Sequence, residues 1–322
     1  MLEKIDLGKK LSKKEYDAVI DDLSVTLSKL QRDAKNLNIP VVIVFEGFGA
    51  AGKGTMINQL LQPLDPRGFS VYSTGTTTEE ESMRPYLWRF ATKMSEKGRI
   101  TIFDRSWYKG VMRDRIDGIT TPEMLATAYD DIISFEKQHT DDGILIIKFF
   151  LHISKKEEKK RFDKLEEEKS TAWRVTKDDW RRYKNYDEHL KMTDEAIEKT
   201  DTSNCPWTVI EAIDKRYAFV KIISNVNARL TEAIELKKRQ QTTPVVEEVA
   251  ITHNQYKSSV LEGIDLSKSL TKAEYTKRLK TAQDKLFNLH NALYKKRIPL
   301  ILAFEGWDAG GKGGAIKRVT EK

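Results

Sequence analysis

A glycine-rich loop between an apolar run and a helix-forming segment constrains this chain more than any other feature. Residues 41–45 read VVIVF, a run typical of a strand buried on both faces, and residues 47–54 read GFGAAGKG. The loop fits the pattern G-x-x-x-x-G-K, in which backbone N–H groups converge on an anion at a helix N-terminus. We therefore expect phosphate to be held by Gly47, Gly52, Lys53 and Gly54, with Lys53 reaching the terminal phosphates.

The same loop occurs twice. Residues 2–57 align without a gap with residues 261–316, at an offset of 304 − 45 = 259, and 22 of these 56 positions are identical. The second loop, GWDAGGKG, adds four phosphate-binding candidates: Gly306, Gly311, Lys312 and Gly313. A period this long indicates a duplicated domain rather than a solenoid. We predict a first domain at 1–239, a polar, proline-broken linker at 240–255, and the start of a second, truncated copy at 256–322.

Strand-like and helical patterns alternate through the first copy. We predict strands at 41–45, 69–73, 100–104, 144–153 and 207–212. Helices are predicted at 12–37, from the loop to 62, and at 83–97, 122–138, 154–169, 178–199 and 215–238, the first with a capping box of Ser12 and Glu15. This order predicts an α/β fold of three layers, a five-stranded parallel sheet between helices, with ligands bound at the carboxyl ends of the strands.

The two loops differ in the groups that could hold a metal. A Ser or Thr hydroxyl usually follows the lysine and binds magnesium, whereas this chain has Gly54 and Gly313 there. Thr55 offers a hydroxyl one residue later, as a phosphate contact. Asp308 inside the second loop is a hard oxygen ligand suited to Mg²⁺, and Gly49 stands in its place in the first loop.

More charged candidates follow the third predicted strand. Asp104 ends that strand, where a magnesium-organising carboxylate is expected. Arginines can neutralise charge on a transferred phosphoryl group, and the candidates are Arg105, Arg113 and Arg115, with Arg84 on the predicted helix 83–97. The alternative interpretation of Asp104 and the arginines after it is a strand end capped by a surface ion pair. The alternative for Arg84 is a solvated helix face. The hairpin at 168–180 predicts a lid with the cations Lys164, Arg174 and Lys177, whereas KKEEKK at 155–160 is typical of a solvated face.

Composition limits the compartment and the partners. The net charge of +7 suits an anionic partner without specifying one, and the single Cys205 excludes a disulfide framework and a cysteine-based metal site. The first residues show no signal-peptide core, and no apolar run reaches the ~20 residues of a membrane span. We expect a cytoplasmic protein that binds neither membrane nor nucleic acid and forms a homo-oligomer.

Several motifs together resemble the second family of polyphosphate kinases over residues 2–240 and the visible part of the second copy. They are the loop GWDAGGKG, YLWRF, IFDRSWY, FFLHIS and PWTVIEA, while LDPRGF, TAWRVTKDDW and the tandem arrangement look most like the two-domain polyphosphate:AMP phosphotransferase branch. The resemblance implies a thymidylate-kinase-like P-loop fold and Mg²⁺-dependent transfer of a phosphoryl group from inorganic polyphosphate to AMP, giving ADP. It also implies catalytic roles for Lys53, Asp104, Arg105 and Arg115, and for Asp308 and Lys312 in the second copy, with Mg²⁺ at Asp104 and Asp308.

The first copy departs from the family pattern at two positions. Gly49 replaces the loop aspartate, and Lys109-Gly110 stands where the family has x-Arg after Trp-Tyr. We therefore expect the first copy to bind but to catalyse weakly, with the second as the catalytic copy. Two alternatives remain, an ATP-dependent nucleoside monophosphate kinase and a non-catalytic polyphosphate-binding scaffold.

Overall fold

The computed structural model describes residues 2–242 and 263–321 and divides the chain into two compact units, 1–245 and 246–322. Each unit is described by itself. None of the described helices combines the length and apolarity that a membrane span requires.

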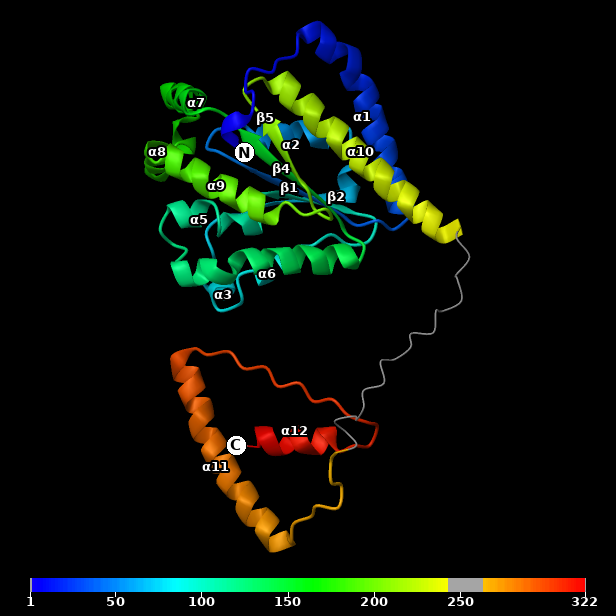
Figure 1. Cartoon of the computed structure of the whole chain (residues 1–322), viewed down its shortest axis with the longest axis vertical. Coiled ribbons are helices and arrows are strands. Elements are labelled where there is room, and N and C mark those ends of the chain that lie inside the picture. Colours follow the sequence, from blue (N-terminus) through cyan, green and yellow to red (C-terminus); the bar gives the residue numbers. More distant parts are fainter. Residues whose placement is uncertain (1, 243–262, 322) are drawn as a thin grey trace. The chain divides into compact units, whose positions relative to one another are not determined.

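Unit 1 is built on a parallel sheet of five strands in the order β2-β3-β1-β4-β5 (Figure 1). The strands are β1 (Val41–Gly47), β2 (Phe69–Ser73), β3 (Ile100–Asp104), β4 (Leu145–His152) and β5 (Trp207–Glu211). The predicted positions of all five strands are confirmed. The loop therefore follows the central strand, where neighbouring strand ends flank it on both sides.

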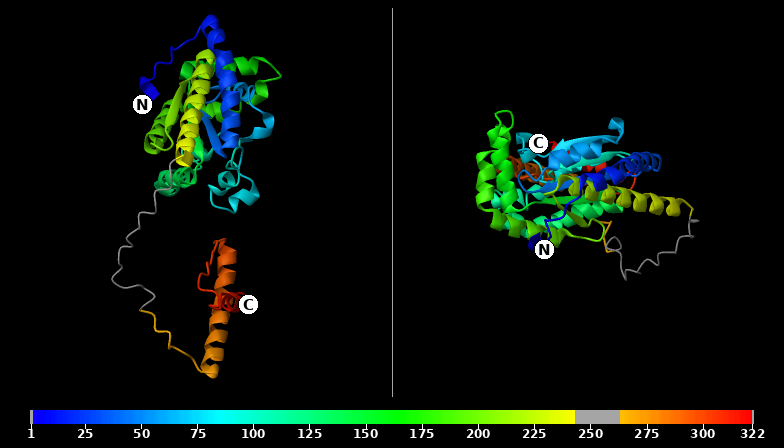
Figure 2. Two further views of the ribbon diagram at one scale, coloured as in Figure 1. Left: turned by 90° about the vertical axis from the view of Figure 1, so that its right-hand side faces the viewer. Right: turned by 90° about the horizontal axis from the view of Figure 1, so that it is seen from above.

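Helices cover both faces of this sheet, which confirms the three-layer α/β/α fold. One face carries α1 (Lys13–Asn36), α2 (Lys53–Leu61) and α10 (Lys215–Thr242), and α1 runs beside α10 (Figures 1 and 2). The other face carries α5 (Arg113–Ile116), α6 (Pro122–Asp141) and α9 (Tyr186–Thr200). At one edge lie α7 (Lys155–Glu167) and α8 (Lys177–Lys184). The short elements are α3 (Glu79–Ser82), α4 (Trp88–Ala91) and the 3₁₀ turns η1 (Leu2–Lys4), η2 (Pro66–Gly68), η3 (Trp107–Lys109) and η4 (Ala172–Arg174).

Local chemistry explains most helix boundaries. Ser12 caps α1, and its side chain and that of Glu15 complete the predicted capping box. The predicted helix 83–97 is wrong, because Pro85 has no N–H to donate and separates α3 from α4. The predicted helix 178–199 is interrupted at Asn185, between α8 and α9. Residues 240–242 belong to α10 rather than to a linker, and the rest of the predicted linker lies outside the described residues.

A charged pair lies at the centre of the core. Lys148 of β4 is fully buried and donates to Glu136 of α6 and to Tyr108, each at 2.8 Å. Its third bond goes to the carbonyl oxygen of Thr200 at 2.9 Å, so all three ammonium donors have partners. Removing one partner of such a pair leaves an uncompensated buried charge, which costs about 3–5 kcal/mol.

Unit 2 contains two described helices, α11 (Lys272–Lys296) and α12 (Lys312–Thr320). Thr271 and Glu274 form the same capping box on α11 that Ser12 and Glu15 form on α1. The apolar segment before the second loop is not a strand, and Ile301 within it is 92% exposed.

Candidate functional site

The glycine-rich loop joins the central strand to α2, and its backbone explains part of its sequence. A Cβ at Gly47 would lie 2.5 Å from the carbonyl oxygen of Leu151, at a φ of +147° that disfavours other residues. Gly52 has a φ of +99° and caps α2, so the chain turns there to present its N–H groups. Ala50 also has a positive φ, 49°.

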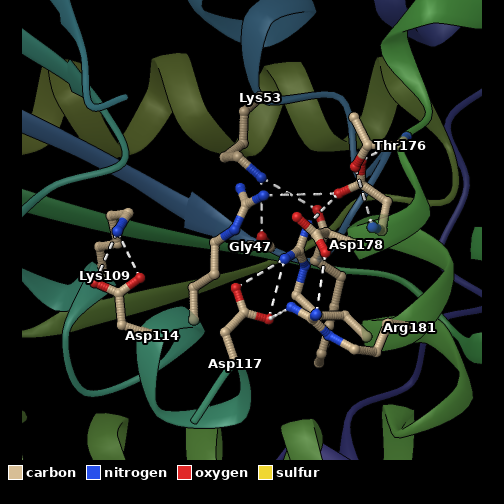
Figure 3. A network of polar contacts seen from close by, with 12 residues as sticks. Gly47, Lys53, Lys109, Asp114, Asp117, Thr176, Asp178 and Arg181 are labelled. Atoms are coloured by element: carbon tan, nitrogen blue, oxygen red, sulfur yellow. Dashed lines mark hydrogen bonds and ion pairs between the residues drawn. The ribbon is translucent and has the colours of Figure 1, made fainter. Parts of the chain in front are cut away.

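Lys53 folds back over the loop. Its Nζ donates to the carbonyl oxygens of Gly47 at 2.8 Å and Phe48 at 3.1 Å (Figure 3). Burial, with the positive charge of Arg105 nearby, lowers the pKa of Lys53 to about 8. Buried behind the loop, Glu46 accepts from the N–H and the hydroxyl of Ser106 at 2.7 and 2.9 Å, and burial raises its pKa to about 6.

Asp104 and Arg105 lie beside the loop because β3 pairs with β1. Asp104 is in register with Phe45 of β1 and with Ser73 of β2. Arg105 adopts a left-handed φ of 63°, and its N–H donates to the carbonyl oxygen of Phe45 at 3.0 Å. A positive φ at a non-glycine residue costs energy and is often retained where it positions a functional side chain.

The loop opens into a cleft of about 1190 Å³ that many charged side chains line. Nine are cationic: Lys53, Arg105, Arg113, Lys160, Arg161, Lys164, Arg174, Lys215 and Arg216. Five are acidic: Asp104, Glu157, Glu168, Asp179 and Asp214. Thr55, Gly52 and Gly54 also line it. The excess of positive charge fits a multiply charged anion.

Two of the predicted arginines lie elsewhere. The Arg84 guanidinium sits 4.2 Å from the ring centre of Trp88 and pairs with Glu80 at 3.1 Å. Arg115 donates to Glu195 at 2.8 Å and to Tyr129 at 3.1 Å. Neither lines the cleft, whereas Arg105 and Arg113 do. Among the predicted lid cations, Lys164 and Arg174 line it and Lys177 does not.

Ion pairs tie α8 to α5. Asp117 pairs with Arg182 at 2.9 Å and with Arg181 at 3.1 Å (Figure 3). Asp179 pairs with Arg182 at 2.6 Å and lies 3.8 Å from Arg113. Burial, together with Arg105 and Arg182, lowers the pKa of Arg113 to about 10. This network gathers positive charge where the cleft meets the loop.

Arg161 of α7 is a loop contact that our sequence analysis did not identify. Its Nη1 donates to the carbonyl oxygens of Ala50 and Ala51 at 3.0 and 3.1 Å. Its Nη2 donates to those of Ala212 and Ile213 at 2.8 and 3.1 Å. One guanidinium thus joins the glycine-rich loop to the chain that follows β5. In the sequence, Arg161 is one arginine among many charged residues, and nothing there distinguishes it.

Neighbouring side chains fill the space beside both glycines that depart from the family pattern. A Cβ at Gly49 would lie 2.7 Å from both Glu158 Oε1 and the Phe162 ring. A Cβ at Gly110 would lie 3.1 Å from the Tyr86 ring and hydroxyl. Glu158 is 4% exposed, so the prediction of a solvated face at 155–160 is wrong at this residue. Burial raises the pKa of Glu158 to about 7, although Gly49 N–H and Lys53 act against the rise.

The carboxylates near the loop determine whether it could hold a metal ion. No group of three or more His, Cys, Asp or Glu side chains able to hold an ion occurs among the described residues. Mg²⁺ commonly takes one or two carboxylates, with waters and substrate phosphates completing its shell. Asp104, which lines the cleft beside Lys53, fits that mode.

The second loop has the same backbone form as the first. Ala309 and Gly311 have φ values of 57° and 82°, close to those of Ala50 and Gly52. Lys312 Nζ donates to the carbonyl oxygens of Gly306 at 2.5 Å and Trp307 at 2.9 Å. Asp308 is exposed in this unit.

Comparison with known proteins agrees with this geometry. The family model of polyphosphate kinase 2 (PPK2) matches residues 10–241 and 269–322. The chain belongs to the polyphosphate kinase 2 family. A polyphosphate kinase 2 structure from Arthrobacter aurescens TC1 is 26% identical, with a TM-score of 0.68 over 72% of this chain and 85% of that one. A polyphosphate kinase 2 structure from Pseudomonas aeruginosa PA01 is 36% identical, with a TM-score of 0.70 over 73% of this chain and 50% of that one.

Curated relatives in the polyphosphate kinase 2 family have a narrower name. The polyphosphate:AMP phosphotransferase of Pseudomonas syringae pv. tomato is 35% identical over 240 residues, which are 74% of this chain and 48% of that protein. The enzyme of the same name from Pseudomonas aeruginosa is 36% identical over 238 residues, with the same coverage. The chain therefore spans about half the length of the curated relatives it matches.

Proposed function

We propose that this chain is part of a phosphotransferase that moves a phosphoryl group from inorganic polyphosphate to a nucleotide, with AMP as the acceptor and ADP as the product. The observation that carries the proposal is the cleft at the glycine-rich loop, which nine cationic and five acidic side chains line. A polyphosphate chain carries a negative charge on every residue, so a large cleft with an excess of cationic side chains suits it. The names of the matched relatives support AMP as acceptor.

Each group in the cleft has a distinct task in this proposal. Lys53 leaves the carbonyl oxygens of Gly47 and Phe48 and pairs with the transferred phosphoryl group. Arg105 and Arg113 neutralise charge that develops on its oxygens. Asp104 would hold Mg²⁺ together with phosphate oxygens, and the ion would supply charge neutralisation. The first copy turns over slowly in this scheme, because Gly49 brings no side chain to the loop and Gly110 brings none to the segment after η3. The second copy, with Asp308 and Lys312, is the catalytic one.

The decisive experiment is ADP formation from AMP and polyphosphate with Mg²⁺ and no ATP. We expect turnover by the 322-residue chain and a loss of less than about 100-fold in Lys53→Met, because the first copy turns over slowly in this scheme. The matched variant Lys312→Met, which tests the second loop, should cost about 100-fold or more. ADP formed only when ATP replaces polyphosphate would favour the ATP-dependent kinase alternative. Polyphosphate binding without turnover would favour the non-catalytic scaffold. The cytoplasmic location and the homo-oligomer stay predictions.

A further inference from the structure

A buried acid from α7 stands where the first loop lacks one. Glu158 Oε1 lies 2.7 Å from the position of a Cβ at Gly49. That is close to the separation between Cβ and a carboxylate oxygen within an aspartate. The backbone N–H of Gly49 donates to the same carboxylate. The acid therefore lies against the loop at the position of the missing side chain.

The second loop supplies the comparison within the same chain. Position 308, the counterpart of Gly49, is an aspartate in GWDAGGKG. The two loops share their left-handed alanine and glycine and their lysine contacts. An aspartate at position 49 would therefore project toward the space that Glu158 and Phe162 occupy.

We propose that Glu158 replaces the loop aspartate in the first copy, so that α7 supplies the carboxylate that the second loop carries at Asp308. This inference rests on the proposed function and deepens it, because any activity left in the first copy would then depend on Glu158. Glu158 does not line the cleft, so it is a positioning residue. It fixes Gly49 N–H, sets the charge beside Lys53, and acts through the loop on a hydrated divalent cation bound to polyphosphate.

A purely structural role makes a different prediction. A side chain that only fills space and accepts the Gly49 N–H can be glutamine as well as glutamate, since both offer an acceptor oxygen. A role that needs negative charge is lost in Glu158→Gln. The position of the charge, rather than the residue that carries it, would matter, so Gly49→Asp should compensate for Glu158→Ala.

The test measures binding of the Mn²⁺–tripolyphosphate complex to the protein by isothermal titration calorimetry, in the 322-residue chain with Asp308→Asn as background. We expect Glu158→Gln and Glu158→Ala to weaken binding about 10- to 100-fold. Gly49→Asp alone should not strengthen binding, because its Cβ would lie 2.7 Å from Glu158 Oε1 and it would set two carboxylates together. Gly49→Asp combined with Glu158→Ala should recover most of the affinity. Asp163→Asn removes a carboxylate from the exposed face of the same helix, where it pairs with Lys159, and should change nothing.

Two results would overturn the inference: wild-type binding by Glu158→Gln, or no recovery in a double variant that circular dichroism shows to be folded. If Glu158→Ala unfolds, the glutamine variant decides the question alone. The assay contains no nucleotide and needs no turnover. Failure of the proposed function, which is absence of AMP phosphorylation by the wild-type chain, is therefore a separate outcome.

Discussion

At Gly47 the fold of the first loop does not tolerate a side chain. It ends β1 next to Leu151 of β4, and both its φ and its surroundings exclude a side chain. Gly54, seven residues later, has nothing within 4 Å of the position of a Cβ. The two glycines thus form a matched pair for measurement.

We expect Gly47→Ala to lower the free energy of unfolding by about 2–4 kcal/mol, from backbone strain and overpacking together. Gly54→Ala lies in the first turn of α2 and should raise that free energy by up to about 1 kcal/mol. Urea denaturation followed by circular dichroism measures both. Similar effects of the two substitutions would contradict the steric argument.

Lys53 makes ligand binding depend on pH. Burial, with Arg105 nearby, lowers its pKa to about 8, so the lysine of the free protein loses its charge as the pH rises through that value. We expect the affinity for tripolyphosphate, measured by isothermal titration calorimetry, to fall above pH 8. Lys53→Met should bind more weakly and lose this step, and a step of equal size in that variant would assign the effect to another group.

Glu158 makes stability depend on pH in a lower range. Its folded pKa of about 7 lies above the ordinary value of 4.5 for a glutamate, so the folded state holds the proton more tightly. The contribution of this group to stability is therefore lost as pH rises from 4.5 to 7. The charged groups that face it are Lys53, Asp179 and Arg182. Glu158→Gln should gain stability relative to wild type across this window, by up to roughly 3 kcal/mol at neutral pH. Denaturation curves at pH 4.5 and 7.5 measure the gain, and an equal difference at both pH values would contradict it.

At the scale of elements, α7 is the helix that controls the first loop. Arg161 holds the carbonyl oxygens of Ala50 and Ala51, and Glu158 and Phe162 pack against Gly49. These three residues lie on one face of the helix, at i, i+3 and i+4. Arg161 also holds the chain after β5. Movement of α7 would therefore displace both the first loop and the chain after β5.

Arg161→Lys should distinguish the contribution of the guanidinium hydrogen bonds to affinity from that of the positive charge. Lysine keeps the positive charge but lacks the planar fork that reaches four carbonyl oxygens. We expect tripolyphosphate affinity to fall about tenfold while the helix content stays unchanged. The control Lys159→Ala removes an exposed cation of the same helix, and an equal loss of affinity there would indicate a general charge effect.

The sequence predicts the sheet better than the surroundings of the loop. Continuous apolar runs such as Val41–Phe45 identify buried strands because burial on both faces demands them. The loop glycines follow from backbone chemistry, and Asp104 follows from its place at the end of β3. Arg161 and Glu158 could not be found in this way, because their roles depend on how α7 packs on a segment more than a hundred residues earlier. Arg84 and Arg115 look like phosphate ligands by composition, and only tertiary structure reveals their partners Trp88 and Glu195.

At the scale of the whole molecule, the two units place equivalent sequences in different surroundings. Residues 41–47 are a central strand with partners on both sides. The counterpart segment, 300–306, is not a strand, and Leu300, Ile301 and Leu302 are more than half exposed. The same apolar pattern therefore forms a strand only where neighbouring strands pair with it.

Hydrogen exchange followed by mass spectrometry should measure this difference. Amide hydrogens in 41–47 should exchange only on global unfolding of unit 1, whereas those in 300–306 should exchange within seconds. The amides inside α1 and α11 provide a comparison in which both segments are helical. Equal protection of the two apolar segments would show that the second segment is also held in a sheet.

The agreement between the two loops has a consequence for how such sites diverge. The second loop keeps its left-handed alanine, its left-handed glycine and its lysine contacts without a strand before it. The backbone conformation of the loop is thus determined by about eight consecutive residues. Its charged surroundings depend on side chains from helices that are distant in the sequence. A duplicated copy can therefore exchange an acid in the loop for an acid on a helix while the turn itself is inherited unchanged. Evolution can alter the reactivity of one copy, in other words, without rebuilding the cradle in which the phosphate lies.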